Sequence, residues 1–259
     1  MKEEEFKPIA KEYLKSLGFD VFDIENKQGV LTPDFAVIGK NDKYTIELKE
    51  KGDDPEEILR DNETLLRGEF LTKNIPIGIR NTLKGIIDDG VQQIKQYDPK
   101  GESFRIIWLH SAGRDPYLHY MRFHSTLFGI EHFISIHPTP SGIKCYYFHE
   151  SAFFSWRNYL DGAIRSYDNK AQLCINSLSP RVEQFRKSEI VFRMGKGLCD
   201  PQKEELSDHN VMIADCEIDR KRSKEVIKYL QTKYSLDHLR AIPLKQSTIT
   251  TLVDDGDKQ

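Results

Sequence analysis

Cysteine is scarce in this sequence, and long apolar runs are missing from it. The 259 residues include four cysteines, no two of which form a C-x-x-C pair: Cys145, Cys174, Cys199 and Cys216. Such spacing predicts reduced thiols rather than a disulfide framework or a zinc site. No run approaches the roughly 18 apolar residues of a transmembrane helix. The N-terminus is charged and amphipathic, without the apolar segment of a secretory signal. These absences predict a cytoplasmic protein without a membrane partner.

An excess of positive charge is also missing. The formal net charge is −3, with 38% hydrophobic and 31% charged residues. The net charge therefore does not indicate a nucleic-acid partner, although a local basic groove can form on a neutral protein. A G-x-x-x-x-G-K-[ST] loop is absent as well, which argues against NTPase activity. The length suffices for one large domain or two small ones with a real core.

Hydrophobic periodicity divides the first half of the chain into a clear series of elements. It predicts a helix over 3–17, a strand over 19–24, a hairpin of strands 32–38 and 44–49, a polar helix over 55–70, a helix over 81–97 and a buried strand over 104–110. The order helix, strand, hairpin, helix, strand is typical of an α/β sandwich.

The second half is predicted to add a C-terminal α/β extension. Its expected elements are strands at 132–138 and 142–150, an aromatic-rich helix over 151–168, a strand over 210–218 and a helix over 220–234. Three acids alternate along that late strand, Asp215, Glu217 and Asp219. We expect an exposed, salt-bridged edge there. Histidines cluster at 110–149, but pairs such as His119 and His124 are five residues apart. That spacing suits neither helical nor strand metal pairs and predicts packing or interface roles.

The hairpin at 32–49 carries an acid on each arm. If it is symmetric about residues 40 and 41, Phe35 lies opposite Ile46 on an apolar face. The same register places Asp34 opposite Glu47 on the other face, with Lys49 two residues farther along. Like charges at facing positions destabilise a hairpin. The pattern therefore predicts a cation between the two carboxylates.

Paired acids of this kind are suited to a hard divalent ion. Facing Cβ atoms lie about 4.5–5.5 Å apart, and Mg²⁺ typically takes one or two carboxylates together with water and phosphate oxygens. Beside such an ion, the ammonium of Lys49 can orient or help deprotonate an attacking water and offset developing charge. The alternative is a solvated hairpin with ordinary surface charges. We expect that removing one acid relieves repulsion and raises the melting temperature slightly.

The stretch PDF…IELK, at residues 33–35 and 46–49, resembles the PD-(D/E)xK motif of the restriction-endonuclease-like nuclease superfamily. The resemblance implies a core of helix, three-stranded meander, helix and strand over residues 3–110. It further implies that Asp34 and Glu47 are metal ligands and that Lys49 is the catalytic lysine. Many members carry a metal-reaching glutamate on the first helix, for which Glu5 is the best-placed candidate and Glu12 the second.

The helix at 81–97 contains a further match to the family. Gln93 and Tyr97 form Q-x-x-x-Y, one turn apart on one face. This is similar to an extra motif beside the active site of exonuclease-type members, which implies a catalytic role for Gln93. Residues 52–80 depart from the compact family pattern, and we expect them to form a substrate-facing excursion.

The resemblance implies a restriction-endonuclease-like α/β fold, with a mixed central sheet flanked by helices. Residues 1–112 would be the nuclease core, and 113–259 an elaboration for substrate or partner binding. The implied activity is a Mg²⁺- or Mn²⁺-dependent DNA nuclease, an endonuclease of restriction or anti-phage defence. Two alternatives stay open: an RNase, and a non-catalytic nucleic-acid or protein-binding subunit that keeps the fold. A protein partner or a homo-oligomer also stays open.

Overall fold

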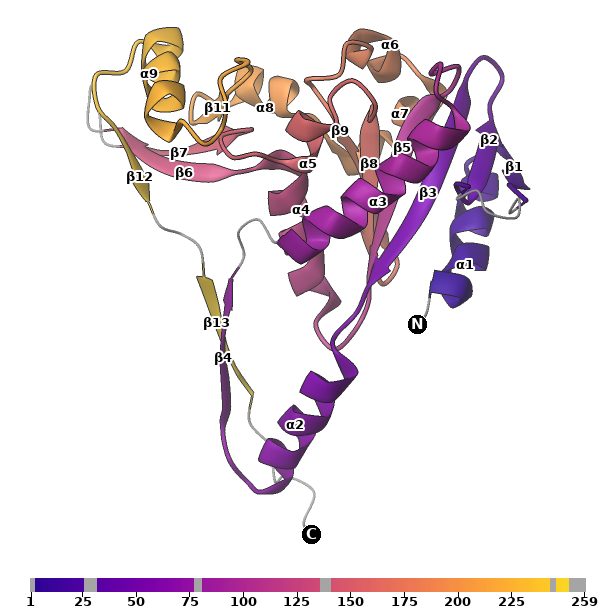
Figure 1. Cartoon of the computed structure of the whole chain (residues 1–259), viewed down its shortest axis with the longest axis horizontal. Helices are drawn as coiled ribbons and strands as arrows, with labels where there is room; N and C mark the ends of the chain where they lie inside the picture. The colour runs from indigo at the N-terminus through magenta and orange to yellow at the C-terminus, as the bar shows by residue number, and fades with distance from the viewer. Residues whose placement is uncertain (1–2, 26–31, 77–80, 136–140, 243–245, 252–259) are drawn as a thin grey trace.

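A computed structural model describes residues 3–25, 32–76, 81–135, 141–242 and 246–251. Its largest feature is a seven-stranded mixed sheet (Figure 1). The strands in spatial order are β1 (Asp20–Asp23), β2 (Phe35–Ile38), β3 (Lys43–Lys51), β5 (Phe104–Ser111), β8 (Gly162–Tyr167), β9 (Lys170–Ile175) and β10 (Leu198–Cys199). The first three form an antiparallel meander, and β5 and β8 continue it in parallel with β3.

Helices cover both faces of this sheet. The helix α1 (Glu3–Ser16) packs Phe6, Ala10 and Leu14, each four residues apart, onto one face. The short helices of that face are α6 (Val182–Arg186) and α7 (Glu189–Arg193), which precede the 3₁₀ turn η1 (Gly195–Gly197). The opposite face is covered by α3 (Asn81–Tyr97), α4 (Pro116–Phe128) and α5 (Ala152–Ser155). The sheet is therefore the middle layer of an α/β sandwich.

A second, four-stranded sheet forms the C-terminal extension. Its order is β11 (Val211–Ile213), β7 (Ser141–Tyr146), β6 (Glu131–Ser135) and β12 (Leu239–Ile242). The helices α8 (Pro201–Ser207) and α9 (Ser223–Tyr234) accompany it, and α9 buries Val226 and Leu230 in the core of this unit.

Residues of the predicted excursion form an arm. The helix α2 (Pro55–Leu66) and the strand β4 (Leu71–Pro76) extend away from both sheets, and β4 pairs with β13 (Gln246–Thr251) near the end of the chain (Figure 1). None of the residues of α2 is buried. Residues 77–80 of the excursion lie outside the described part of the chain.

Most predicted elements of the first half are confirmed, including the helix at 81–97 and the strand at 104–110. The aromatic-rich helix predicted over 151–168 is wrong, because that stretch contains the four-residue α5 and then β8. The strand predicted over 210–218 ends at Ile213, so Asp215, Glu217 and Asp219 follow it in a loop. The large sheet continues beyond residue 112, since β8, β9 and β10 belong to it; the division of the chain at that residue stays a prediction.

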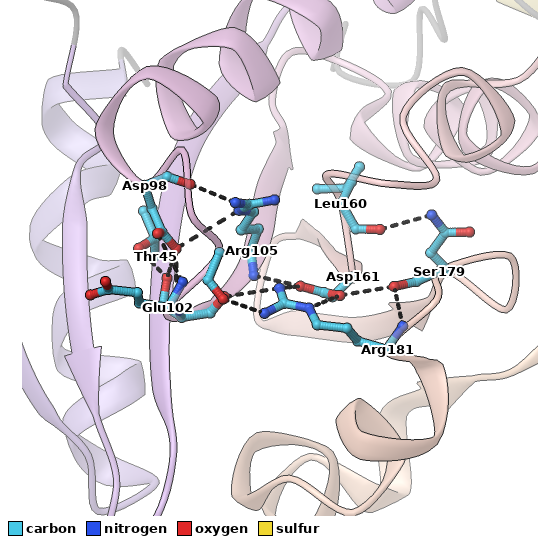
Figure 2. A network of polar contacts seen from close by, with 11 residues as sticks. Thr45, Asp98, Glu102, Arg105, Leu160, Asp161, Ser179 and Arg181 are labelled. Carbon is cyan, nitrogen blue, oxygen red and sulfur yellow. Dashed lines mark hydrogen bonds and ion pairs between the residues drawn. The ribbon is translucent and has the colours of Figure 1, made fainter.

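A buried polar network closes the amino ends of β5 and β8 (Figure 2). The carboxylate of Asp161 accepts hydrogen bonds from the amide of Arg105 and the hydroxyl of Ser179, both at 2.9 Å, and forms an ion pair with Arg181. The guanidinium of Arg105 donates to the carbonyl of Asp98. Satisfied charges of this kind fix strand ends, because a buried charge without a partner is costly.

Within the described residues, no helix has the length and apolar character needed to cross a membrane.

Candidate active site

The hairpin has the predicted register. Phe35 pairs with Ile46, and Val37 with Tyr44, so that these apolar side chains enter the core beneath α1. Asp34 lies just before β2, and its Oδ2 accepts a hydrogen bond of 2.9 Å from the backbone amide of Leu48. Since Leu48 directly follows Glu47, the two acids lie at neighbouring points of the hairpin.

Three side chains on the α3 side of the sheet meet in one hydrogen-bonded group. Glu47 is 2% exposed, and its Oε1 accepts from Lys49 Nζ at 2.5 Å. With its amide nitrogen turned toward the carboxylate, Gln93 donates to Glu47 Oε1 at 2.7 Å and Oε2 at 3.1 Å, while its oxygen accepts from Lys49 Nζ at 3.3 Å. The side chain predicted from the Q-x-x-x-Y pattern therefore contacts both residues of the E-x-K pair. Tyr97 is 45% exposed, at the end of α3.

A glycine lets α3 approach β3 at this point. A Cβ atom on Gly90 would lie 3.2 Å from Glu47 Cγ, 3.4 Å from Lys49 Cε and 2.8 Å from Ile107 Cδ1. Real Cβ contacts are rarely this short, so a larger residue would push the helix or the side chains away. Gly90 lies about one turn before Gln93, and it thereby sets the distance from which Gln93 reaches the strand.

The first helix contributes a lysine to the site. Lys7 Nζ donates to Asp34 Oδ1 at 2.6 Å, with side chains 34% and 15% exposed. Glu5 is exposed and stands about 200° around the helix from Lys7. Glu12 pairs with Lys15 at 2.8 Å. The metal-ligand role of Glu5 stays a prediction, and the helix residue that the structure places at Asp34 is Lys7.

Each acid of the hairpin thus has a lysine partner: Lys7 for Asp34 and Lys49 for Glu47. These ion pairs reduce the repulsion between the two carboxylates of the hairpin, because two ammonium groups balance their charge. The donor set still fits a hard divalent ion. It is made of carboxylate oxygens, which keep lone pairs beyond those used by the lysines, and the Asp34 side chain is partly exposed.

Another acid, Asp53, lies just beyond β3. Its carboxylate accepts from the Arg114 amide at 2.7 Å and contacts His119 Nε2 at 3.0 Å. Burial alone would raise the pKa of Asp53, but these hydrogen bonds outweigh it, and the pKa is lowered from its ordinary value. The contact ties the carboxyl end of β3 to α4, and it explains His119 as the structural residue that the sequence predicts.

Sequence reasoning missed Lys7. A signal for it exists, since Lys7 and Lys11 are one turn apart on the side of α1 that flanks the apolar face, and Lys11 pairs with Asp23 of β1. Two lysines at that spacing, beside strands flanked by acids such as Asp23 and Asp34, indicate a helix held to strand edges by ion pairs.

No protein-family model matches the sequence, and no curated protein matches it. Among solved structures, the chain is similar to the Holliday junction resolvase Hjc of Archaeoglobus fulgidus. The two are 12% identical, with a TM-score of 0.24, over 41% of this chain and 66% of the resolvase chain. So low a TM-score carries no weight for function, and the fold rests on the strand order and helix placement described above.

Proposed function

We propose that the chain is a divalent-metal-dependent nuclease that hydrolyses phosphodiester bonds of DNA, in restriction or anti-phage defence. The observation that supports it most directly is the group of Glu47, Lys49 and Gln93, brought together from β3 and α3. Asp34 accepts a hydrogen bond from the backbone amide of Leu48, the residue between Glu47 and Lys49. A structural ion pair needs no amide across both of its members, whereas a reactive carboxylate and lysine need to be held in orientation.

Each residue has a separate role in the proposed reaction. Asp34 and Glu47 would hold Mg²⁺ or Mn²⁺, which supplies positive charge to a phosphate oxygen and makes nearby water more acidic. Lys49 places an ammonium beside the scissile phosphate and offsets charge as it develops there. Gln93 fixes Glu47 and Lys49 relative to one another. Lys7 forms an ion pair with Asp34 in the absence of the metal ion. Once that ion pair is broken, its ammonium is available to a DNA phosphate.

The direct test is cleavage by the purified full-length chain. We expect nicking or degradation of plasmid or linear DNA in the presence of Mg²⁺ or Mn²⁺, and no cleavage with EDTA. Glu47→Gln keeps an oxygen for Lys49 but lacks the negative charge, so it should abolish cleavage. Glu217→Gln is the matched control. Glu217 is an exposed acid in the loop after β11, and it pairs with Arg157.

Two outcomes would replace the proposal. Cleavage of RNA, with none of DNA, would indicate an RNase. Metal-independent DNA binding without cleavage in either ion would favour the non-catalytic subunit, in which Lys7 and Lys49 neutralise the acids permanently.

A further inference from the structure

Two cysteines and a histidine meet far from the hairpin. The ligand atoms of His124, Cys174 and Cys199 all lie within 4.8 Å of one another. Cys174 is fully buried, and His124 Nδ1 is buried without a hydrogen-bond partner. No local motif joins these residues, because His124 and Cys174 are 50 positions apart and Cys174 and Cys199 are 25 positions apart.

The strand register explains how the residues meet. Cys174 on β9 and Cys199 on β10 are direct partners in a parallel ladder, so their side chains leave the same face of the sheet side by side. That face is covered by α4, which carries His124. Register pairs place Glu47 on this face too, three strands away from Cys174. At about 4.8 Å per strand, the cluster lies roughly 14 Å from the hairpin site.

Sulfur and imidazole together select a soft or borderline cation. Two thiolates and one neutral imidazole are a common donor set for Zn²⁺. Zn–S bonds of about 2.3 Å put the ligand atoms of a tetrahedral site about 3.8 Å apart. Side-chain rotations that shift the ligand atoms by about 1 Å would bring them from the observed separation to that spacing. Two thiolates also cancel the charge of Zn²⁺, which suits a buried site.

The surroundings favour a metal over a pair of inert thiols. Arg165 Nε lies 3.3 Å from Cys174 Sγ, and a guanidinium at that distance favours the thiolate form that binds metal. The His124 ring is held edge-on against Phe128, with centroids 4.9 Å apart. His124 and Cys199 also line a pocket of about 550 Å³, together with Lys144, Lys203 and Glu204.

We infer that His124, Cys174 and Cys199 form a Zn²⁺ site with three protein ligands, whose fourth position faces this pocket and takes water or a small anion. The ion ties the two-residue strand β10 to β9 and α4. It thereby fixes the start of α8, which follows β10 directly and leads into the C-terminal sheet.

The test is the metal content of the full-length chain, purified without an affinity tag under reducing conditions from zinc-supplemented culture. We expect about one zinc ion per chain by elemental analysis. After removal of the metal, Co²⁺ added to the wild-type chain should produce thiolate-to-cobalt absorption. Cys174→Ser, Cys199→Ser and His124→Asn should each lower the bound metal by at least tenfold.

Two matched controls separate this site from other features. Cys216→Ser should keep the zinc, since Cys216 lies in the loop after β11. Glu47→Gln should also keep it, whatever its effect on cleavage. Wild-type chain that contains no zinc and gives no cobalt absorption would overturn the inference, even if the ligand variants fail to fold. A disulfide between Cys174 and Cys199 in the freshly purified chain, detected by mass spectrometry, would overturn it too.

Discussion

At the scale of single residues, the pairing of Glu47 with Lys49 changes an expectation about stability. The side chains of Glu47 and Lys49 are 2% and 17% exposed, so removal of the acid takes an ion-pair partner from a largely buried ammonium. We predict that Glu47→Ala lowers the free energy of unfolding by about 3–5 kcal/mol, measured by urea denaturation. Relief of repulsion between the acids was expected to act in the opposite direction. A Glu47→Ala chain that is more stable than wild type would show that repulsion dominates.

Gln93 is a positioning residue whose effect can be separated from folding. We predict that Gln93→Ala lowers kcat for DNA cleavage by about 10–100-fold, as is typical when a residue that orients a ligand is lost. KM for DNA should change little, because the hydrogen bonds of Gln93 are to Glu47 and Lys49 and it is proposed to orient them rather than to bind DNA. Gln92→Ala and Gln96→Ala are matched controls, since both are exposed on α3. Equal losses in all three variants would point to damage of the helix.

Residue positions could be predicted where the partner is close in sequence. The register of the hairpin follows from alternation over residues 34–49, so the placement of Asp34 beside Leu48, the residue between Glu47 and Lys49, needs no knowledge of the rest of the fold. Gln93 was found through a family resemblance. Cys174 and Cys199 were missed because their meeting depends on which strands pair, and β9 and β10 are joined by two helices and a turn.

At the scale of elements, the approach of α3 to β3 depends on one glycine. Alanine in a helix interior is normally favoured over glycine by about 1 kcal/mol, and Gly85→Ala should show this gain, as a Cβ there meets nothing within 4 Å. Gly90→Ala would place its Cβ 2.8 Å from Ile107 Cδ1, at a cost of about 1–3 kcal/mol. We predict opposite shifts in melting temperature, with cleavage reduced in Gly90→Ala alone. A gain in both variants would mean that Ile107 moves aside freely.

The same scale shows where periodicity fails. The strand β5 was predicted from a continuous apolar run, and α3 from apolar residues at helical spacing. The strand β8 was missed, because both of its faces are buried and its sequence, GAIRSY, has neither alternation nor a long apolar run. Arg165 and Ser166 are buried there through bonds to Cys174 and Trp108, which a window of local sequence does not contain.

At the scale of the whole molecule, His110 couples stability to pH. The ring of His110, on β5, is stacked on Phe6 of α1 with ring centroids 3.7 Å apart. Burial lowers the pKa of this ring from 6.5 to about 4. A lowered histidine pKa means that the fold favours the neutral ring. Its contribution is therefore fully present above pH 6.5 and is lost as the pH falls toward 4, by an amount of about 3 kcal/mol.

We predict that the free energy of unfolding, measured by urea denaturation at several pH values, falls more steeply between pH 6.5 and 4 in wild type than in His110→Gln. His209→Gln is the control, because His209 is exposed after α8 and its loss should leave the profile as in wild type. Parallel profiles for wild type and His110→Gln would show that the pKa of His110 is the same in the folded and the unfolded chain.

Binding of a divalent ion should also stabilise the whole molecule. An ion that binds the folded chain but not the unfolded one adds about 2.7 kcal/mol at a hundredfold excess over Kd. Because Lys7 and Lys49 already balance the two acids, their positive charges oppose the binding of a cation, and we expect a weak response to Mg²⁺ alone. DNA should strengthen it, since phosphate groups supply ligands to the ion and a new partner for the lysines. We therefore predict a larger rise in melting temperature with DNA and Ca²⁺ together than the sum of the two separate effects. Glu47→Gln should remove this excess, and Glu217→Gln should keep it. An excess of equal size in Glu47→Gln would place the ion away from the hairpin.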